Sequence, residues 1–563
     1  MELLEQHFDT AFAAPDGIKK LRELILTLAM QGKLVPQDPN DLPASQLLKE
    51  IEAEKSRLWR DGKIKAPKPL PEITTAEIAY ALPQGWEWVR MGEVSSYIQR
   101  GKSPVYTDYS SHRVISQKCV RWNGLDLEPA RFIEANSLRK YEPIRFLKGG
   151  DLLWNSTGTG TIGRACVVSN ELDHAELVAD SHVTVVRALL LNPTFLWRWI
   201  QSPIVQNEIE SVASGTTNQI ELNTSTVINH LMPLPPLEEQ HRIVARIDQL
   251  MAHCDELERL RAERELKRRS VHTAALSQLL DAQAADSFAD AWQFISQHFG
   301  DLYAEKENVT ELRKAILQLA VMGKLVPQNP NDPPASQLLK GVETEKRRFV
   351  KEGKVKAPKS LPEIKEEEIP FSLPLGWMWI RLGEIGYTNI GLTYAPSDVA
   401  DTGIPVLRSN NVQNGKLDLS DMKRVEVQVK ESVLVQEGDL LICARNGSKA
   451  LVGKTALITN LTEPMAFGAF MAIFRSRFNQ YLLRFINSPL FRKMIDEVNT
   501  MTINQITQDN LRSTLCPLPP LAEQMRIVAK IDELMILCDT LEKQVDSAAG
   551  KQTELLNAVM AQV

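Results

Sequence analysis

Two long segments of the chain carry apolar residues at the spacing of one helix face. In residues 237–282 the apolar side chains recur at steps of three and four, the period of an amphipathic helix. Pro235 and Pro236 stand just before this segment, where a helix tolerates proline. Residues 521–562 repeat the pattern, with one interruption at Gly550. The pattern predicts two helices, the longer spanning about 70 Å at about 1.5 Å per residue. The stripes consist of Ile243, Val244, Ile247, Leu250, Met251, Cys254 and Leu257, and of Ile527, Val528, Ile531, Leu534, Met535, Cys538 and Leu541.

Such narrow stripes favour pairing of the two helices as a coiled coil, because the predicted length exceeds the diameter of one domain. Antiparallel pairing would relate the two halves of the chain by a pseudo-twofold axis. The alternative is that each helix lies on its own globular domain. A basic run on the first helix is more typical of a solvated face than of a DNA contact. This run consists of Arg261, Arg264, Lys267, Arg268 and Arg269.

The chain is an internal duplication. Residues 21–94 match residues 312–385, including LRELILTLAMQGKLVPQDPND against LRKAILQLAVMGKLVPQNPND. PLPPLEEQHRIVARIDQLMAHCDELE at 233–258 matches PLPPLAEQMRIVAKIDELMILCDTLE at 517–542. The two stretches between these matches agree only in fragments, such as GGDLLWNSTG against EGDLLICARNG. Uniform drift would blur frame and middle alike, so we infer two similar mounts that hold two different domains.

The order of segments predicts a closed arrangement. In the centre of the chain the long helix precedes the GKLVPQ segment, whereas at the ends the GKLVPQ segment comes first and the helix last. Joining the two termini would restore the central order, so we expect the N-terminal segment to pack against the C-terminal helix. The chain then divides into five segments. These are 1–81, a helical segment repeated at 300–372; 82–236, the first variable domain; 237–372, the central helix and linker; 373–520, the second variable domain; and 521–563, the C-terminal helix.

Two variable domains, each closed by PLPPLxEQxRIVA(R/K)IDxL, together with AILxxAxxGKLVPQ, resemble the specificity subunits of Type I restriction–modification systems. The resemblance implies an α+β protein: two mixed α/β target recognition domains separated by long antiparallel coiled-coil helices, in a pseudo-twofold duplication. Each domain would read one half of a bipartite site in double-stranded DNA. The helices would set the spacer and bind two methyltransferase subunits, and motor–nuclease subunits would complete this host-defence complex. The alternative is a coiled-coil assembly scaffold that does not read DNA.

The resemblance also implies that this chain carries no catalytic site and no cofactor, since partner subunits would bind S-adenosylmethionine, ATP and Mg²⁺. The motifs agree with this expectation. Gly158–Gly163 spells G-x-G-x-x-G, but a strand-like stretch follows where a dinucleotide site needs a helix. Gly453-Lys454-Thr455 and Gly101-Lys102-Ser103 each lack the first glycine of a phosphate loop. Asn192-Pro193-Thr194-Phe195 lacks the second proline of an adenine methyltransferase loop. We therefore expect turns at the glycines, and no metal site.

Composition limits the remaining classes. The net charge of −6 is unusual for a DNA-binding protein, although local clusters of Lys and Arg matter more than the sum. No apolar run is long enough to cross a bilayer, so no membrane partner is expected. Six cysteines occur without a C-x-x-C pair, which is typical of reduced thiols in a cytoplasmic protein.

Cationic and amide side chains in the expected loops of the variable domains are the candidates for DNA contact. Arg and Lys pair with guanine edges or phosphates, and Asn and Gln pair with adenine. The same residue types are common in plain turns. Asn-Gln-Ile occurs before the closing helix in both halves, which favours a structural or phosphate role for its polar residues. Trp86, Trp88, Trp377 and Trp379 recur with their glycines and are predicted to be packing anchors. The candidates are Arg100, Lys102, Lys118, Arg121, Asn123, Arg164, Asn218 and Gln219 in the first domain, and Arg408, Asn410, Asn411, Arg445, Lys449, Asn504 and Gln505 in the second.

Overall fold

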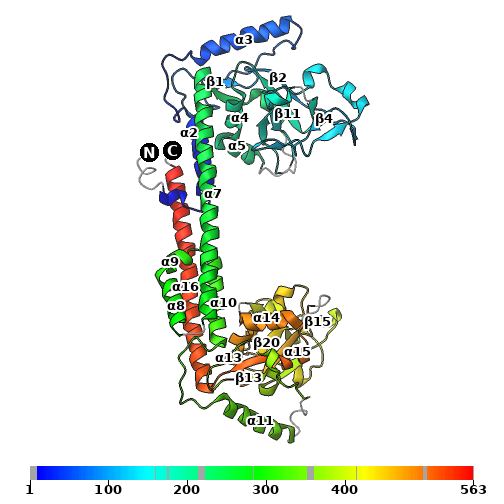
Figure 1. Cartoon of the computed structure of the whole chain (residues 1–563). Helices are drawn as coiled ribbons and strands as arrows, with labels where there is room; N and C mark the ends of the chain where they lie inside the picture. Colours follow the sequence, from blue (N-terminus) through cyan, green and yellow to red (C-terminus); the bar gives the residue numbers. More distant parts are fainter. Residues whose placement is uncertain are drawn as a thin grey trace. The chain divides into compact units, whose positions relative to one another are not determined.

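A computed structural model of the chain divides into two compact units (Figure 1). The first contains Met1–Glu263 and Ala549–Val563, and the second contains Arg264–Ala548. Each unit holds one variable domain, and each takes one end of both long helices. The structure describes residues 9–158, 160–173, 176–213, 222–282, 285–351, 360–413, 415–498 and 504–561.

The first variable domain is built on two four-stranded sheets. Short runs rich in Val, Ile and Leu form its central strands, and β8 is buried along its whole length. A two-stranded ladder of β1 (Glu87–Arg90) and β12 (Leu231–Leu234) closes the domain at its base. Helix α4 (Pro193–Gln201) contacts β9. The first sheet has the order β2 (Ser95–Arg100), β11 (Val183–Ala188), β8 (Leu152–Asn155), β9 (Ala165–Val167), and the second the order β10 (Leu177–Ala179), β4 (Arg113–Ile115), β7 (Arg131–Ile133), β3 (Tyr106–Thr107).

The second variable domain has the same strand order, although its sequence differs. The ladder of β13 (Met378–Arg381) and β24 (Leu515–Leu518) again closes the base. The first sheet has the order β14 (Tyr387–Ile390), β23 (Met471–Arg475), β20 (Leu440–Cys443), β21 (Thr455–Leu457). The second has the order β22 (Ala466–Phe467), β16 (Ile404–Leu407), β19 (Lys423–Val425), β15 (Val399–Ala400), which matches the second sheet of the first domain strand by strand. The duplication therefore includes the variable domains. Their strand order is the same in both halves, although their sequences match only in short fragments.

The long helices are α7 (Leu237–Asp281) and α16 (Leu521–Met560). Helix α7 begins in the first unit and ends in the second, and α16 does the reverse, so the two helices run in opposite senses, as predicted. The apolar stripes of the two helices also pack against shorter helices and the variable domains. Ile243, Ile247 and Cys254 pack in one cluster with α2 (Gly17–Met30) and the first variable domain. The matching stripe of α16 packs in the same way with α10 (Lys306–Val321) and the second domain. The predicted fold class, two mixed α/β domains separated along a duplicated chain by long helices, is confirmed.

The chain closes on itself through its terminal segments. Ala11, Phe12 and Leu24 form a buried cluster with Leu556 and Val559 of α16. The guanidinium of Arg261 on α7 also donates to the carbonyl oxygen of Ala14, at 3.1 Å. The predicted packing of the N-terminal segment against the C-terminal helix is confirmed.

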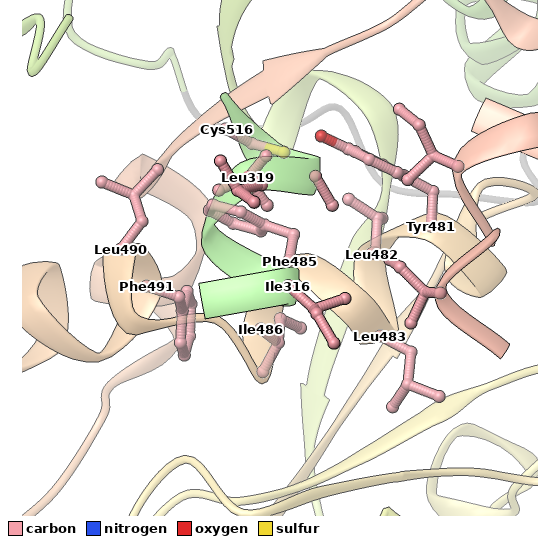
Figure 2. Close-up of a cluster of buried hydrophobic side chains, with 14 of the residues drawn as sticks. Ile316, Leu319, Tyr481, Leu482, Leu483, Phe485, Ile486, Leu490, Phe491 and Cys516 are labelled. Carbon is pink, nitrogen blue, oxygen red and sulfur yellow. The ribbon is translucent and has the colours of Figure 1, made fainter. Parts of the chain in front are cut away.

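Helix α10 supplies the centre of the second unit's core. Figure 2 shows Ile316 and Leu319 of α10 among side chains of α13 (Asn479–Ile486) and α14 (Pro489–Val498). Phe485 is fully buried there, and the hydroxyl of Tyr481 donates to the carbonyl oxygen of Pro517 at 2.7 Å. The repeated GKLVPQ segment is therefore the part of the frame on which the domain packs.

The six cysteines are all buried and unpaired, as reduced thiols. Burial raises the pKa of the Cys166 thiol to about 12, so this sulfur stays protonated. Among the described helices, none is long and apolar enough to cross a membrane.

Candidate nucleic-acid interface

The repeated PLPPLxEQxR motif anchors each variable domain to its helix. Glu239 of this motif is 2% exposed, and its carboxylate accepts hydrogen bonds from Trp86 Nε1 and Gln37 Nε2, both at 2.9 Å. Trp377 Nε1 donates to Glu523 in the other half, also at 2.9 Å. Burial raises the pKa of both carboxyl groups above their usual value. These contacts confirm Trp86 and Trp377 as packing anchors.

A buried ion pair explains one fragment that the two variable domains share. The Gly-Asp turn before β8 places Asp151, 1% exposed, 2.7 Å from Arg187 on β11. The same turn before β20 places Asp439, also 1% exposed, 2.6 Å from Arg475 on β23. The Asp carboxylates also accept from the backbone amides of Lys148 and Gln436. This shared fragment therefore holds the sheet together.

Backbone hydrogen bonds give the residue-by-residue correspondence of the loops. The amide of Cys119 donates to Ser116, and the amide of Asn411 donates to Arg408, at 2.9 and 3.0 Å. The turn that holds Lys118 therefore corresponds to the turn that holds Asn410. Two of the predicted contact residues, chosen separately in each half, occupy one structural position.

The glycine motifs lie in corresponding hairpins. Strands β8 and β9 pair antiparallel, as do β20 and β21. Gly163 donates its amide to Asn155 at 3.0 Å, and Gly453 donates to Cys443 at 2.8 Å. Both glycines have positive φ, of 82° and 88°, which L side chains rarely adopt. The predicted turns at these two glycines are confirmed, and a strand follows each of them. The turn predicted at Gly101 is wrong, because Gly101 follows β2 and its amide donates to the carbonyl oxygen of Val183 on β11 at 3.0 Å.

The predicted residues of the first domain differ in what they contact. Arg100 ends β2, and its carbonyl oxygen accepts from Arg145 at 3.1 Å. The amide of Lys102 donates to Ala179 at 3.2 Å. Arg121 is 3.7 Å from Asp126, and Arg164 donates to the carbonyl oxygen of Gly160 at 2.8 Å. Lys118 and Asn123 have exposed side chains.

The bond from Asn155 Nδ2 to the Gln117 carbonyl oxygen, at 3.0 Å, joins the turn that holds Lys118 to the loop after β8. Two predicted residues, Lys118 in this turn and Arg164 in this loop, therefore lie close together. Asn218 and Gln219 lie outside the described residues.

The second domain brings three predicted segments together. Asn446 Nδ2 donates to Ser409 Oγ at 3.5 Å, which links the 408–411 turn to the loop after β20. Asn504 Nδ2 donates to the carbonyl oxygen of Gly447 at 3.1 Å, and Gln505 forms a β-bridge with Arg445. The loop after β20 is thus the centre of the predicted site.

Several candidates in this domain already have protein partners. Arg408 pairs with Asp421 at 3.1 Å, Asn410 donates to the same carboxylate, and Lys449 pairs with Asp496 at 3.3 Å. Asn411 is 1% exposed, and its amide group donates to the carbonyl oxygens of Asp418 and Asp421. Asn411 therefore shapes the turn, and its side-chain amide is not exposed to pair with a DNA base.

The second Asn-Gln-Ile copy, at 504–506, has a defined backbone register. The amide of Leu222 donates to Ser156, and the amide of Ile506 donates to Ala444, both at 2.8 Å. Ile506 therefore corresponds to Leu222, and Asn504-Gln505 precede it directly.

Sequence reasoning missed exposed aromatic side chains in both variable domains. Phe470 is 62% exposed, and the Cζ atom of Arg445 is 5.5 Å from the centre of its ring. The Cζ atom of Arg131 is 3.7 Å from the ring of Tyr106, and Tyr109 is 86% exposed. The exposed aromatics could have been suspected only where turn residues flank them. Within the described ranges, no group of three His, Cys, Asp or Glu residues could hold a metal ion.

The sequence profile described as "Type I restriction modification DNA specificity domain" matches residues 83–268 and 374–548. The Escherichia coli Type I restriction enzyme EcoAI specificity subunit is 35% identical over 96% of this chain and 93% of its own length. The Escherichia coli EcoEI specificity subunit shares 35% identity with the same coverage. The crystal structure of the HsdS subunit from Thermoanaerobacter tengcongensis matches 87% of this chain and 98% of its own, with 21% identity and a TM-score of 0.43. The chain belongs to the Type I restriction–modification specificity subunits, a family of non-catalytic subunits.

Proposed function

We propose that this chain reads a bipartite site in double-stranded DNA, with one variable domain on each half-site. The observation that carries the proposal is the contrast within each domain. The two domains share their strand order, the buried Asp–Arg pair and the backbone bonds that hold the loops. The exposed side chains on those loops differ, as two readers of different half-sites require.

Partner subunits supply the chemistry in this proposal. Two methyltransferase subunits bind the helical frame, and motor–nuclease subunits complete the restriction enzyme in the cytoplasm. S-adenosylmethionine, ATP and Mg²⁺ bind to those partners. The purified chain should therefore give no heat of binding with S-adenosylmethionine in calorimetry, and measurable binding would contradict this assignment of the cofactor.

The decisive test is the exchange of one variable domain. Residues 95–232 are replaced by the matching segment of a relative, and the genome of cells that carry the methyltransferase partner is sequenced for methylated bases. One half of the recognised site should change while the other stays. Changes in both halves, or in neither, would contradict one domain reading one half-site.

The long helices are proposed to set the spacer between the half-sites. Four residues inserted after Leu266, which is 66% exposed, add slightly more than one helical turn and roughly 6 Å. That length is close to the rise of two base pairs at about 3.4 Å each. We expect unchanged half-sites with a longer spacer. An active enzyme with the original spacer would show that these helices do not set it.

A further inference from the structure

Each variable domain has two loop positions that are equivalent by strand register to two positions in the other domain. Asn155 pairs with Val183 across β8 and β11, and Cys443 pairs with Met471 across β20 and β23. Thr157 and Arg445 each stand two residues beyond those strand ends. His182 and Phe470 each stand one residue before the neighbouring strand. The register therefore makes Thr157 equivalent to Arg445, and His182 equivalent to Phe470.

Identical backbone bonds fix these positions in both domains. The amide of Ser156 donates to the carbonyl oxygen of His182, and the amide of Ala444 donates to that of Phe470, both at 2.9 Å. On the other side, the bonds from Leu222 to Ser156 and from Ile506 to Ala444 close the same loop. Because only main-chain atoms make these bonds, the loop is held whatever side chains it carries.

The side chains at these fixed positions form a pair in each domain, with different chemistry. Thr157 Oγ1 lies 2.6 Å from His182 Nδ1 in a hydrogen bond. In the second domain the Arg445 guanidinium lies over the Phe470 ring instead. We call Thr157–His182 the first rim pair and Arg445–Phe470 the second rim pair.

Folding alone does not account for the second rim pair. Phe470 leaves most of its ring in water, although burial of such a side chain is worth about 1.5–3 kcal/mol. Arg445 is exposed beside it. A guanidinium held beside an apolar ring suits a base pair in the major groove, since Arg binds guanine O6 and N7 and an apolar group contacts the thymine methyl. The first rim pair offers a hydroxyl and an imidazole, which suit other base edges.

We propose that the two rim pairs are equivalent specificity-determining positions of the two domains, with Arg445 of the second pair reading a guanine. This inference rests on the proposed function, and it names the residues that distinguish one half-site from the other. The rigid loop presents the two side chains at the same place in each domain, so an exchange of rim pairs should transfer base choice.

The test uses the full chain together with its methyltransferase partner and maps methylated bases across the genome. One variant, Arg445→Gln, keeps an amide at the rim but removes the guanidinium. Discrimination at one base pair of the second half-site should fall on the order of ten- to a hundredfold, and the first half-site should stay unchanged. The matched control is Arg477→Gln, because Arg477 also lies over a phenylalanine ring, at 5.0 Å, but that ring, of Phe478, is buried away from the rim. The control should leave both half-sites intact.

The second variant carries the substitutions Thr157→Arg and His182→Phe, which place the second rim pair on the first domain. One base pair of the first half-site should then shift toward guanine. This variant also decides the matter if Arg445→Gln does not fold.

Uniformly weaker methylation at the original sequence in both variants would overturn the proposal, because it would reassign the rim to phosphate contact or to structure. That result would leave the domain-exchange test of the proposed function untouched. If the exchange of residues 95–232 changed no half-site, the proposed function itself would fail.

Discussion

Asp151 and Asp439 share both a position and a role in the two variable domains, whereas Thr157 and Arg445 share a position and differ in chemistry. The first two residues are 1% exposed, and each makes an ion pair with an arginine on the neighbouring strand. The other two lie in the loops that follow β8 and β20, where Thr157 is half-buried and Arg445 is exposed. At the first pair of positions the side chain completes the fold and is the same in both domains, whereas at the second pair it lies in a loop and differs.

The same division separates the frame from the loops. Trp86 and Trp377 donate to Glu239 and Glu523 with the same distance of 2.9 Å. Removing one partner from such a buried contact leaves the other unsatisfied, which is costly. Replacing an exposed rim residue leaves no buried partner unsatisfied, so the residue type at that position can match the base that each domain reads. The comparison therefore predicts large, matched stability effects in the frame and small ones at the rim.

The largest effect should come from the buried ion pairs, and it should differ between the domains. Arg187→Ala leaves Asp151 buried without its cation, and we expect a loss of about 3–5 kcal/mol of unfolding free energy. Arg475→Ala should cost less, because the Arg475 side chain is 38% exposed against 16% for Arg187, so water can solvate the remaining carboxylate. Hydrogen exchange in urea reports each domain separately within the full chain. Equal losses would show that exposure does not control this cost.

The tryptophan anchors should give the next largest effect, and here the two halves should match. Trp86→Phe and Trp377→Phe remove the donor to a buried glutamate, so each should cost about 1–3 kcal/mol. Trp88→Phe is the control, because the Trp88 Nε1 bond to the Tyr80 carbonyl oxygen is long, at 3.4 Å. Shifts in the urea midpoint provide the measurement. A control as damaging as the two anchor variants would assign the loss to ring packing.

The buried glutamates predict a pH dependence of stability. Burial raises the pKa of Glu239 in the folded chain above its ordinary value of 4.5, so folding opposes ionisation. This penalty is absent below the ordinary pKa and becomes complete as pH rises through the raised pKa. Glu239→Gln should therefore become more stable relative to the parent chain as pH rises above 4.5.

Glu523→Gln should behave in the same way, because burial raises that pKa too. Urea midpoints of both variants across the pH range provide the measurement. A difference from the parent chain that stays constant with pH would mean that neither carboxyl group titrates differently in the folded chain.

The smallest effect should come from the exposed ion pairs of the frame. Arg22 lies 2.7 Å from Asp255 and 2.8 Å from Glu258, and Arg313 makes the corresponding pairs with Asp539 and Glu542. Arg22→Met and Arg313→Met keep the apolar stem, and each should cost at most about 1 kcal/mol. The loss should shrink further in high salt. A loss that salt does not reduce would assign these arginines to packing.

The sequence by itself determined the frame. The duplicated PLPPLxEQxR and GKLVPQ segments, the long helices and the tryptophan anchors could all be predicted, because core-facing residues repeat at the period of their element. The hairpin at Gly163 was also predictable, since a strand-like run follows the glycines where a cofactor site needs a helix. Family membership followed from the same repeated motifs.

Only the tertiary structure decided how the variable domains use their polar residues. Asn411 and Lys118 look alike as loop residues in the sequence, but Asn411 is buried and holds a turn while Lys118 faces solvent. The sequence also could not place Gln505, which forms a β-bridge with Arg445 in the structure. The equivalence of His182 and Phe470 depends on strand register, which contacts between distant segments set, and neither residue type repeats. The side chains proposed to contact bases follow neither a helix nor a strand period, because the positions of the base edges in DNA determine their spacing.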